Sequence, residues 1–145
     1  MIFPDTDSDD YKHRKTLNED IQIRPVNPTS NHWDIQMENG DYVNVTGLES
    51  LRNAICIAIM TRLNELDFMP LYDGFGCRVH ELVKANKSEM VKYKIKLFTS
   101  DVLKNMRRIK EVNSVTVTDS DSSSYLIQFN VTSISDELIE GSVTI

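Results

Sequence analysis

The feature that most constrains the fold is a run of apolar side chains at helical spacing within residues 48–64. Leu51, Ile55 and Ile59 recur every four residues, so they lie on one side of a helix. Further small or apolar residues widen this stripe: Leu48, Ala54, Cys56, Ile57, Ala58, Met60 and Leu63. A helix that is apolar on so many sides belongs in the core or in a subunit interface. We therefore expect a central helix over 48–64.

A tight turn and a capping signal precede this helix. Asn39-Gly40 is a favoured pair for a two-residue hairpin turn, because both of its positions must tolerate positive φ. Apolar residues alternate with polar ones before and after the pair. The sequence therefore predicts a β-hairpin over 33–45. Thr46 and Glu49 then have the spacing of a capping box at the start of the helix.

A loop of unusual composition follows the central helix at residues 66–76. One proline and two glycines forbid a regular helix there. The loop nevertheless carries large apolar side chains, which are Phe68, Leu71, Tyr72 and Phe75. Because a solvated loop would not carry them, we expect the loop to pack beneath the helices. A short helix over 77–83 and a long helix from Ser88 to Met106 are expected to follow.

Alternating strands end the chain. Apolar side chains occupy every second position at 114–118 and 125–132, which is typical of strands with one buried face. The tail over 135–145 ends in a strand-like stretch at 142–145. The stretches 115–118 and 142–145 lack charges, prolines and bulge signals. Either a partner covers their edges, or they pair with each other inside the fold.

These elements predict an α+β fold with an N-terminal β-hairpin, a helical core and C-terminal antiparallel β-strands. The helical core contains two longer helices and one short helix. We expect one domain over 21–145, in which the hairpin occupies 33–45, the helices lie within 48–106 and the strands lie within 114–145. Residues 1–20 precede this domain as a leader.

Charge and hydropathy exclude several classes of partner. Four aspartates in the leader precede the basic run Lys12-His13-Arg14-Lys15, which is either a solvated tail or an arm that docks on a partner. The net charge of the 145-residue chain is −6, a poor match for duplex nucleic acid, whose binding depends on Lys and Arg contacts to phosphates. No apolar stretch reaches the ~18 residues of a membrane span, and the acidic N-terminus does not resemble a signal peptide. We therefore expect folding in a cytoplasm, without a nucleic-acid or membrane partner.

The residue types that carry catalysis or bind metals are present but scattered. His13, His32 and His80 are far apart and have no ligand-type partner at local spacing. Neither cysteine lies in a catalytic motif, and no nucleotide-binding glycine loop is present. A glycosidase needs two carboxyl groups across its substrate, but a chain with 22 acidic residues offers many such pairs. Those that flank the loop are Glu65, Asp67, Asp73 and Glu81. We expect no enzyme activity, no metal and no cofactor.

Several short motifs occur in the order and at the spacing of one known family. Thr61-Arg62 follows the central stripe, Pro70 and Phe75-Gly76 lie in the loop, and Arg108-Ile109 follows the long helix. Together they resemble the small baseplate-wedge proteins of contractile-tailed phages, also called sheath initiators. The hairpin resembles the related defective-prophage tail subgroup. The resemblance covers about residues 33–135.

The resemblance implies a structural protein of the virion tail baseplate, assembled in the host cytoplasm. It implies that the chain links the baseplate wedge to the first sheath ring and initiates sheath polymerisation by strand addition. The implied partners are the tail sheath protein, the wedge and core-bundle proteins of a six-fold baseplate, and hub or tube-proximal proteins. We assign interaction or structural roles to Arg62, Pro70, Phe75, Gly76, Arg108, Ile109, Val115, Val117, Ile127 and Phe129.

Two other functions stay open. Some family members have been labelled lysozymes, so a tail-associated peptidoglycan hydrolase is the alternative, although no catalytic pair carries over to residues of this chain. The same motifs fit an adaptor in a bacterial secretion or killing machine of the same architecture.

One motif departs from the family pattern. The family's Glu-Pro-Arg-Ile motif is replaced here by Met106-Arg107-Arg108-Ile109, so its Glu and Pro are missing. Arg108 is either a buried or interfacial guanidinium that fixes the joint between helix and strand, or a solvent-facing residue that interacts with the helix dipole.

Overall fold

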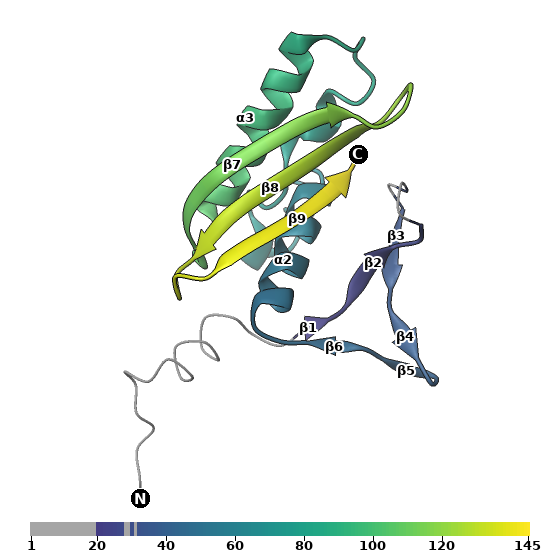
Figure 1. Cartoon of the computed structure of the whole chain (residues 1–145), viewed down its shortest axis with the longest axis vertical. Coiled ribbons are helices and arrows are strands. Elements are labelled where there is room, and N and C mark those ends of the chain that lie inside the picture. The colour runs from purple at the N-terminus through teal and green to yellow at the C-terminus, as the bar shows by residue number, and fades with distance from the viewer. Residues whose placement is uncertain (1–19, 28–29, 31) are drawn as a thin grey trace, which may run out of the picture.

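The computed structural model describes residues 20–27, 30 and 32–145, and it has an α+β fold. A three-stranded antiparallel sheet has the order β7 (Ile109–Asp119), β8 (Tyr125–Ser133) and β9 (Leu138–Thr144). Helices α2 (Leu48–Met60) and α3 (Glu89–Asn105) cover one face of this sheet (Figure 1). The predicted α+β class is therefore confirmed. The predicted leader at 1–20 lies outside the described residues, apart from its last residue.

The core forms between α2 and the inward face of the sheet. Leu51, Ile55 and Ile59 are fully buried, as the helical stripe predicts. They belong to one apolar cluster with residues that alternate along β8: Tyr125, Ile127, Phe129 and Val131. The core is packed so closely beside Gly141 in β9 that this position has no room for a side chain. A Cβ atom there would lie 2.5 Å from the Phe129 ring.

Helix α2 begins at Leu48, as the sequence predicts, but it ends before the expected residue 64. Helix α2 stops at Met60 because Thr61 adopts an extended conformation, with φ −82° and ψ 132°. The predicted capping box is wrong: the residue before α2 is Gly47, and no side chain caps the helix start. Glu49 instead forms an ion pair with Arg52.

The second helical region is close to expectation. Helix α3 begins where the sequence places it, and the Ser88 hydroxyl accepts a hydrogen bond from the Val91 N–H at 3.2 Å. The expected short helix is a single 3₁₀ turn, η2 (Arg78–Glu81).

The N-terminal hairpin is confirmed around its turn. Asn39 and Gly40 have φ values of 51° and 80°, and they join β4 (Met37–Glu38) to β5 (Asp41–Tyr42). Beyond these short strands, the two segments that flank the turn separate. Strand β3 (Trp33–Ile35) pairs with the earlier segment 23–25 and not with the residues that follow the turn.

Three short ribbons therefore meet in an arm over residues 20–45. The other two ribbons are β2 (Ile23–Pro25) with β3, and β1 (Asp20–Ile21) with β6 (Asn44–Val45). At their junction, Gln22 N–H donates to the Val43 carbonyl at 2.8 Å, and Val43 N–H donates to the Gln36 carbonyl at 3.1 Å. Gln36 N–H donates to the Gln22 carbonyl at 2.8 Å, which completes a ring of three backbone hydrogen bonds. Figure 1 shows the arm as a triangle beside α2.

Asn53 attaches this arm to the core. It is a buried polar residue on α2, and its side-chain oxygen accepts the Ile23 N–H at 3.0 Å. Its side-chain nitrogen donates to the Ile21 carbonyl at 2.9 Å and to the Asp20 carboxylate at 3.0 Å. All of these bonds replace contacts with water, so the arm and the helix form one packed unit.

The C-terminal tail supplies a third strand. The stretches 115–118 and 142–145 do not pair with each other. Each pairs with β8, on opposite sides of that strand. Strand β8 is therefore central, and the outward edges of β7 and β9 are the two edges of the sheet.

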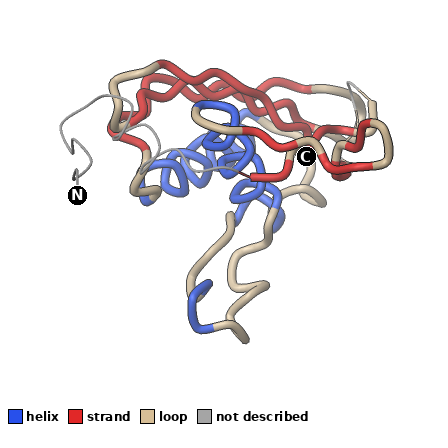
Figure 2. Tube along the Cα trace, turned by 90° about the horizontal axis from the view of Figure 1, so that it is seen from below, coloured by secondary structure: helices blue, strands red, loops and turns tan. Residues whose placement is uncertain are grey.

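The loop between α2 and η2 is the largest departure from expectation. It does not pack beneath the helices; it projects from the body on the side away from the sheet, with the 3₁₀ turn η1 (Pro70–Tyr72) near its tip (Figure 2). Leu71 is 94% exposed and Phe68 is 76% exposed. The predicted burial of this loop is therefore wrong.

The base of the loop depends on one glycine. Gly76 has φ +114°, and a Cβ atom there would lie 2.4 Å from the Arg62 carbonyl oxygen. Beside it, Cys77 N–H donates to the Thr61 carbonyl at 2.9 Å, and Leu63 N–H donates to the Cys77 carbonyl at 3.2 Å. Any larger residue at 76 would push these two segments of the backbone apart.

Replacing this glycine tests the account of the loop base. We expect Gly76→Ala to lower the free energy of unfolding by roughly 2 kcal/mol or more, because it adds a backbone clash to an unfavourable φ. Gly74→Ala is the matched control, because Gly74 also has positive φ but open space around its Cβ position. Gly74→Ala should lower the free energy of unfolding by only about 1–2 kcal/mol. Equal stability of the two variants in urea titrations would contradict the close approach at Gly76.

Candidate functional site

The outward edge of β9 presents backbone groups that β8 does not use. Tyr125 and Ile145 exchange two hydrogen bonds, both at 2.9 Å, so this pair is hydrogen-bonded within the ladder. Hydrogen-bonded and non-hydrogen-bonded pairs alternate in antiparallel sheets. The even-numbered residues of β9 therefore direct their N–H and C=O groups away from β8. Of these, Leu138, Glu140 and Ser142 are exposed.

A groove runs beside this edge. It has a volume of about 320 Å³ and lies between β9, α2 and the arm. The wall on the side of the arm is formed by Ile23, Pro25 and Trp33. The wall on the side of the sheet is formed by Gly141 and Ser142. The edge of β9 is thus open but flanked, which is a suitable shape for an added strand.

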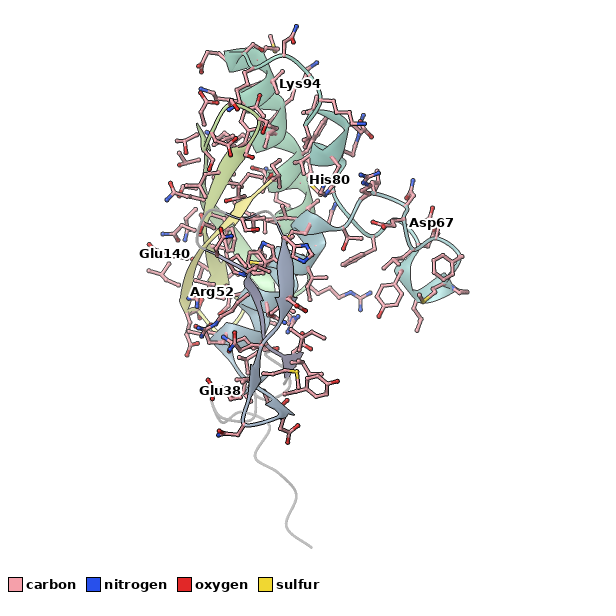
Figure 3. All side chains as sticks on the ribbon, turned by 90° about the vertical axis from the view of Figure 1, so that its right-hand side faces the viewer. Glu38, Arg52, Asp67, His80, Lys94 and Glu140 are labelled. Carbon is pink, nitrogen blue, oxygen red and sulfur yellow. The ribbon has the colours of Figure 1, made fainter. Side chains whose placement is uncertain are left out.

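Arg52 reaches from α2 to the edge of β9. Its Nε donates a hydrogen bond to the Glu140 carbonyl at 2.7 Å, and its guanidinium also pairs with Glu49 (Figure 3 labels Arg52 and Glu140). One of the outward acceptors of β9 is therefore occupied by a side chain. A strand that pairs along the whole edge has to displace this contact, whereas a strand that pairs near Ser142 does not.

The edge of β7 is less regular. Its pairing with β8 has two register shifts between residues 109 and 114, whereas the seven residue pairs of β8 and β9 show none. At its other end, Asp119 is held by Lys92 at 3.2 Å and Lys87 at 3.3 Å. The hydrogen bond from Lys92 is the main cause that lowers the pKa of Asp119. Bulges and charges of this kind protect an edge from pairing, so β9 is the better candidate.

The residues predicted for the strands lie mainly in the core. Val115, Ile127 and Phe129 are buried, and Val117 packs against the same cluster from a partly buried position. Ile109 is also buried at the start of β7. Their side chains join the sheet to the helices, so any contact with a partner strand has to be made by backbone groups at the sheet edges.

The residues predicted for the loop form its base and its tip. Arg62 and Gly76 approach each other at the base, as described above. Pro70 opens the turn η1 at the tip. The Phe75 ring is half-buried and contacts the Tyr72 ring edge-on, with 5.8 Å between ring centroids.

Arg108 lies at the joint between α3 and β7. Its side chain is partly buried, and burial lowers the pKa of the guanidinium while the charge of Asp20 opposes this shift. Its carbonyl accepts the Ile134 N–H at 3.0 Å. Its Nη1 is buried and has no hydrogen-bond partner within the described part of the chain. The side chain is thus only partly buried, and no hydrogen bond joins its guanidinium Nη1 to the expected carbonyl or carboxylate among the described residues.

The carboxylates around the loop hold local structure. Glu65 accepts the Arg62 N–H at 3.1 Å, and Asp67 accepts the Gly74 N–H at 3.2 Å. Glu81 pairs with Arg78 at 3.3 Å. The fourth flanking carboxylate, Asp73, instead lines a groove between the loop and α3, together with Asp101.

Other candidate groups are also used for packing. The His80 ring nitrogen Nε2 lies 2.9 Å from the Ile59 carbonyl. Burial raises the pKa of the Cys56 thiol to about 12. Within residues 20–27, 30 and 32–145, no three His, Cys, Asp or Glu side chains are placed to hold a metal ion. No helix in this part of the chain is long and apolar enough to cross a membrane.

Comparisons with known proteins show a likeness of fold. No protein-family model matches the chain, and no curated protein matches its sequence. A crystal structure of a Geobacter sulfurreducens protein described as a "putative tail lysozyme" has a TM-score of 0.57 to this chain and 22% sequence identity. The similarity covers 67% of this chain and 87% of that one. At this identity the likeness shows that the two proteins share a fold.

Proposed function

We propose that this chain is a structural subunit of a contractile tail, and that it joins the baseplate to the first ring of sheath subunits. The observation that carries the proposal is the open, regular edge of β9 beside a groove. The order of the short motifs supports it, as does the shared fold with a protein whose description names a tail protein, a tail lysozyme. In this function the sheet accepts a strand from a sheath subunit.

The geometry of β9 explains how such a strand binds. Outward N–H and C=O groups of alternate residues provide the hydrogen bonds, and these bonds supply affinity without regard to sequence. Alternate side chains of the added strand face the groove beside Trp33 and α2, where they supply specificity. The added strand becomes the fourth of the sheet and covers an edge that is otherwise a pairing hazard.

The remaining surfaces bind the proteins of the baseplate. The partners in this proposal are the sheath protein, the wedge and core-bundle proteins, and the hub or tube-proximal proteins of a six-fold assembly in the virion. The same geometry serves an injection machine of bacterial origin. The proposal includes no nucleic-acid partner, no membrane partner and no cofactor.

A peptidoglycan hydrolase is the second candidate, because the structurally similar protein is described as a tail lysozyme. A retaining or inverting hydrolase needs two carboxyl groups at a defined separation across a substrate cleft. Three of the four carboxylates near the loop instead accept backbone hydrogen bonds or pair with an arginine. We therefore propose that the chain is not an enzyme.

Turbidity measurements distinguish these two functions. The purified protein should not clear a suspension of peptidoglycan between pH 4 and pH 8, whereas a commercial lysozyme does. Glu65→Gln and Glu81→Gln variants provide the controls, and we expect them to behave like the parent protein. Clearing that disappears in either variant would establish a hydrolase and refute the structural proposal.

A single proline tests the role of the β9 edge. Ser142 directs its N–H away from β8, so Ser142→Pro removes an edge donor and leaves the internal ladder intact. We expect this variant to fold and to enter the baseplate but to leave tubes without sheath in negative-stain images. Ser142→Ala, which keeps the N–H, should give normal sheaths. Sheaths of normal length on particles that contain the proline variant would show that this edge does not start the sheath.

A further inference from the structure

The projecting loop carries an apolar surface that the proposed strand addition does not use. Leu71 and Phe68 are largely exposed at its tip, the neighbouring Met69 and Tyr72 are also accessible, and so is Leu63 at the base of the loop. Figure 2 shows the loop reaching away from the sheet, and Figure 3 shows Asp67 well outside the body of the protein. Contiguous apolar surface of this kind marks an interaction site on a soluble protein.

Backbone hydrogen bonds within the loop fix its shape. Met69 N–H donates to the Leu66 carbonyl at 2.9 Å, and Tyr72 N–H donates to the Met69 carbonyl at 2.9 Å. Across the loop, Asn64 N–H donates to the Phe75 carbonyl at 3.1 Å. A surface that is ordered before it binds loses less conformational entropy on binding. The exposed side chains are therefore presented by a preformed structure.

A groove continues this apolar surface onto the body. It has a volume of about 360 Å³ and lies between the loop and the second half of α3. Its apolar lining comes from both sides: Leu63, Leu71 and Phe75 from the loop, and Phe98, Val102 and Met106 from α3 and its end. A partner could therefore contact both the projecting tip of the loop and the groove beside it.

The charges around this surface are mostly negative. Glu65, Asp67 and Asp73 lie in the loop with a single basic residue, Arg62, so the segment 62–76 carries a net charge of −2. Asp101 adds a further carboxylate to the lining of the groove, and the basic residue in that lining, Arg78, is paired with Glu81. An acidic rim repels anionic lipid surfaces and would also repel the same loop of a second copy. It favours a partner with basic residues around an apolar segment.

We propose that the loop 62–76 and the groove beside α3 form a docking surface for a second protein that presents an apolar segment flanked by Lys or Arg. This surface lies apart from the β9 edge, so it does not depend on the proposed strand addition. A protein with both surfaces can hold two different partners at the same time.

Selection from a random peptide library tests this proposal with the full chain. The library is panned against the immobilised protein and against the double variant Phe68→Ser/Leu71→Ser, which should fold because both side chains are exposed. We expect the parent protein alone to enrich peptides that combine apolar residues with Lys or Arg. A synthesised winning peptide should bind the double variant at least tenfold more weakly. Met90→Ser, which changes an exposed apolar residue at the other end of α3, should bind it as the parent does.

Several outcomes would overturn the proposal. Equal enrichment by the parent and the double variant would place the binding elsewhere, and enrichment of acidic peptides would refute the assigned chemistry. Sedimentation with phosphatidylcholine or phosphatidylserine vesicles that is lost in the double variant would make the loop a membrane anchor. A dimer of the parent that becomes monomeric in the double variant would make the occupant a second copy. Ser142→Pro should not change peptide binding, which separates this result from the failure of strand addition.

Discussion

Burial of α2 is the constraint on which the rest of the structure depends. Its apolar side packs against the inward face of β8 and β9, and Leu51, Ile55 and Ile59 lose all contact with solvent there. Its polar positions are used as well, because Asn53 holds the arm and Arg52 reaches the edge of β9. Its C-terminal end begins the projecting loop at Thr61. One helix therefore positions the edge, the groove beside it and the loop.

This arrangement fits the work of an adaptor in a large assembly. In the two proposals, the β9 edge supplies backbone pairing, which binds strongly but reads few side chains, whereas the loop supplies apolar and charged side chains that select a partner. In the proposed function the first surface receives a sheath strand and the second contacts another component.

The parts of the fold that could be predicted are those with a periodic or a local chemical signal. The stripe through Ile55 indicates a buried helix, alternation through Ile127 indicates a strand, and Asn39-Gly40 requires a turn. The junction of the arm has no such signal, since Gln22, Gln36 and Val43 meet through backbone groups that every residue possesses. The exposed loop was mispredicted because an apolar composition is the same for a buried segment and for a docking surface. The candidate edge on β9 depends on which strand is central, and that is a long-range property.

Amide hydrogen exchange of β9 tests the central claim most directly. In the free protein, the outward amides of Glu140 and Ser142 should exchange much faster than those of Gly141 and Val143, which face β8. When the sheath protein is added, we expect the two outward amides to become protected while the inward ones change little. Outward amides that exchange equally fast with and without a bound sheath protein would show that β9 does not accept its strand.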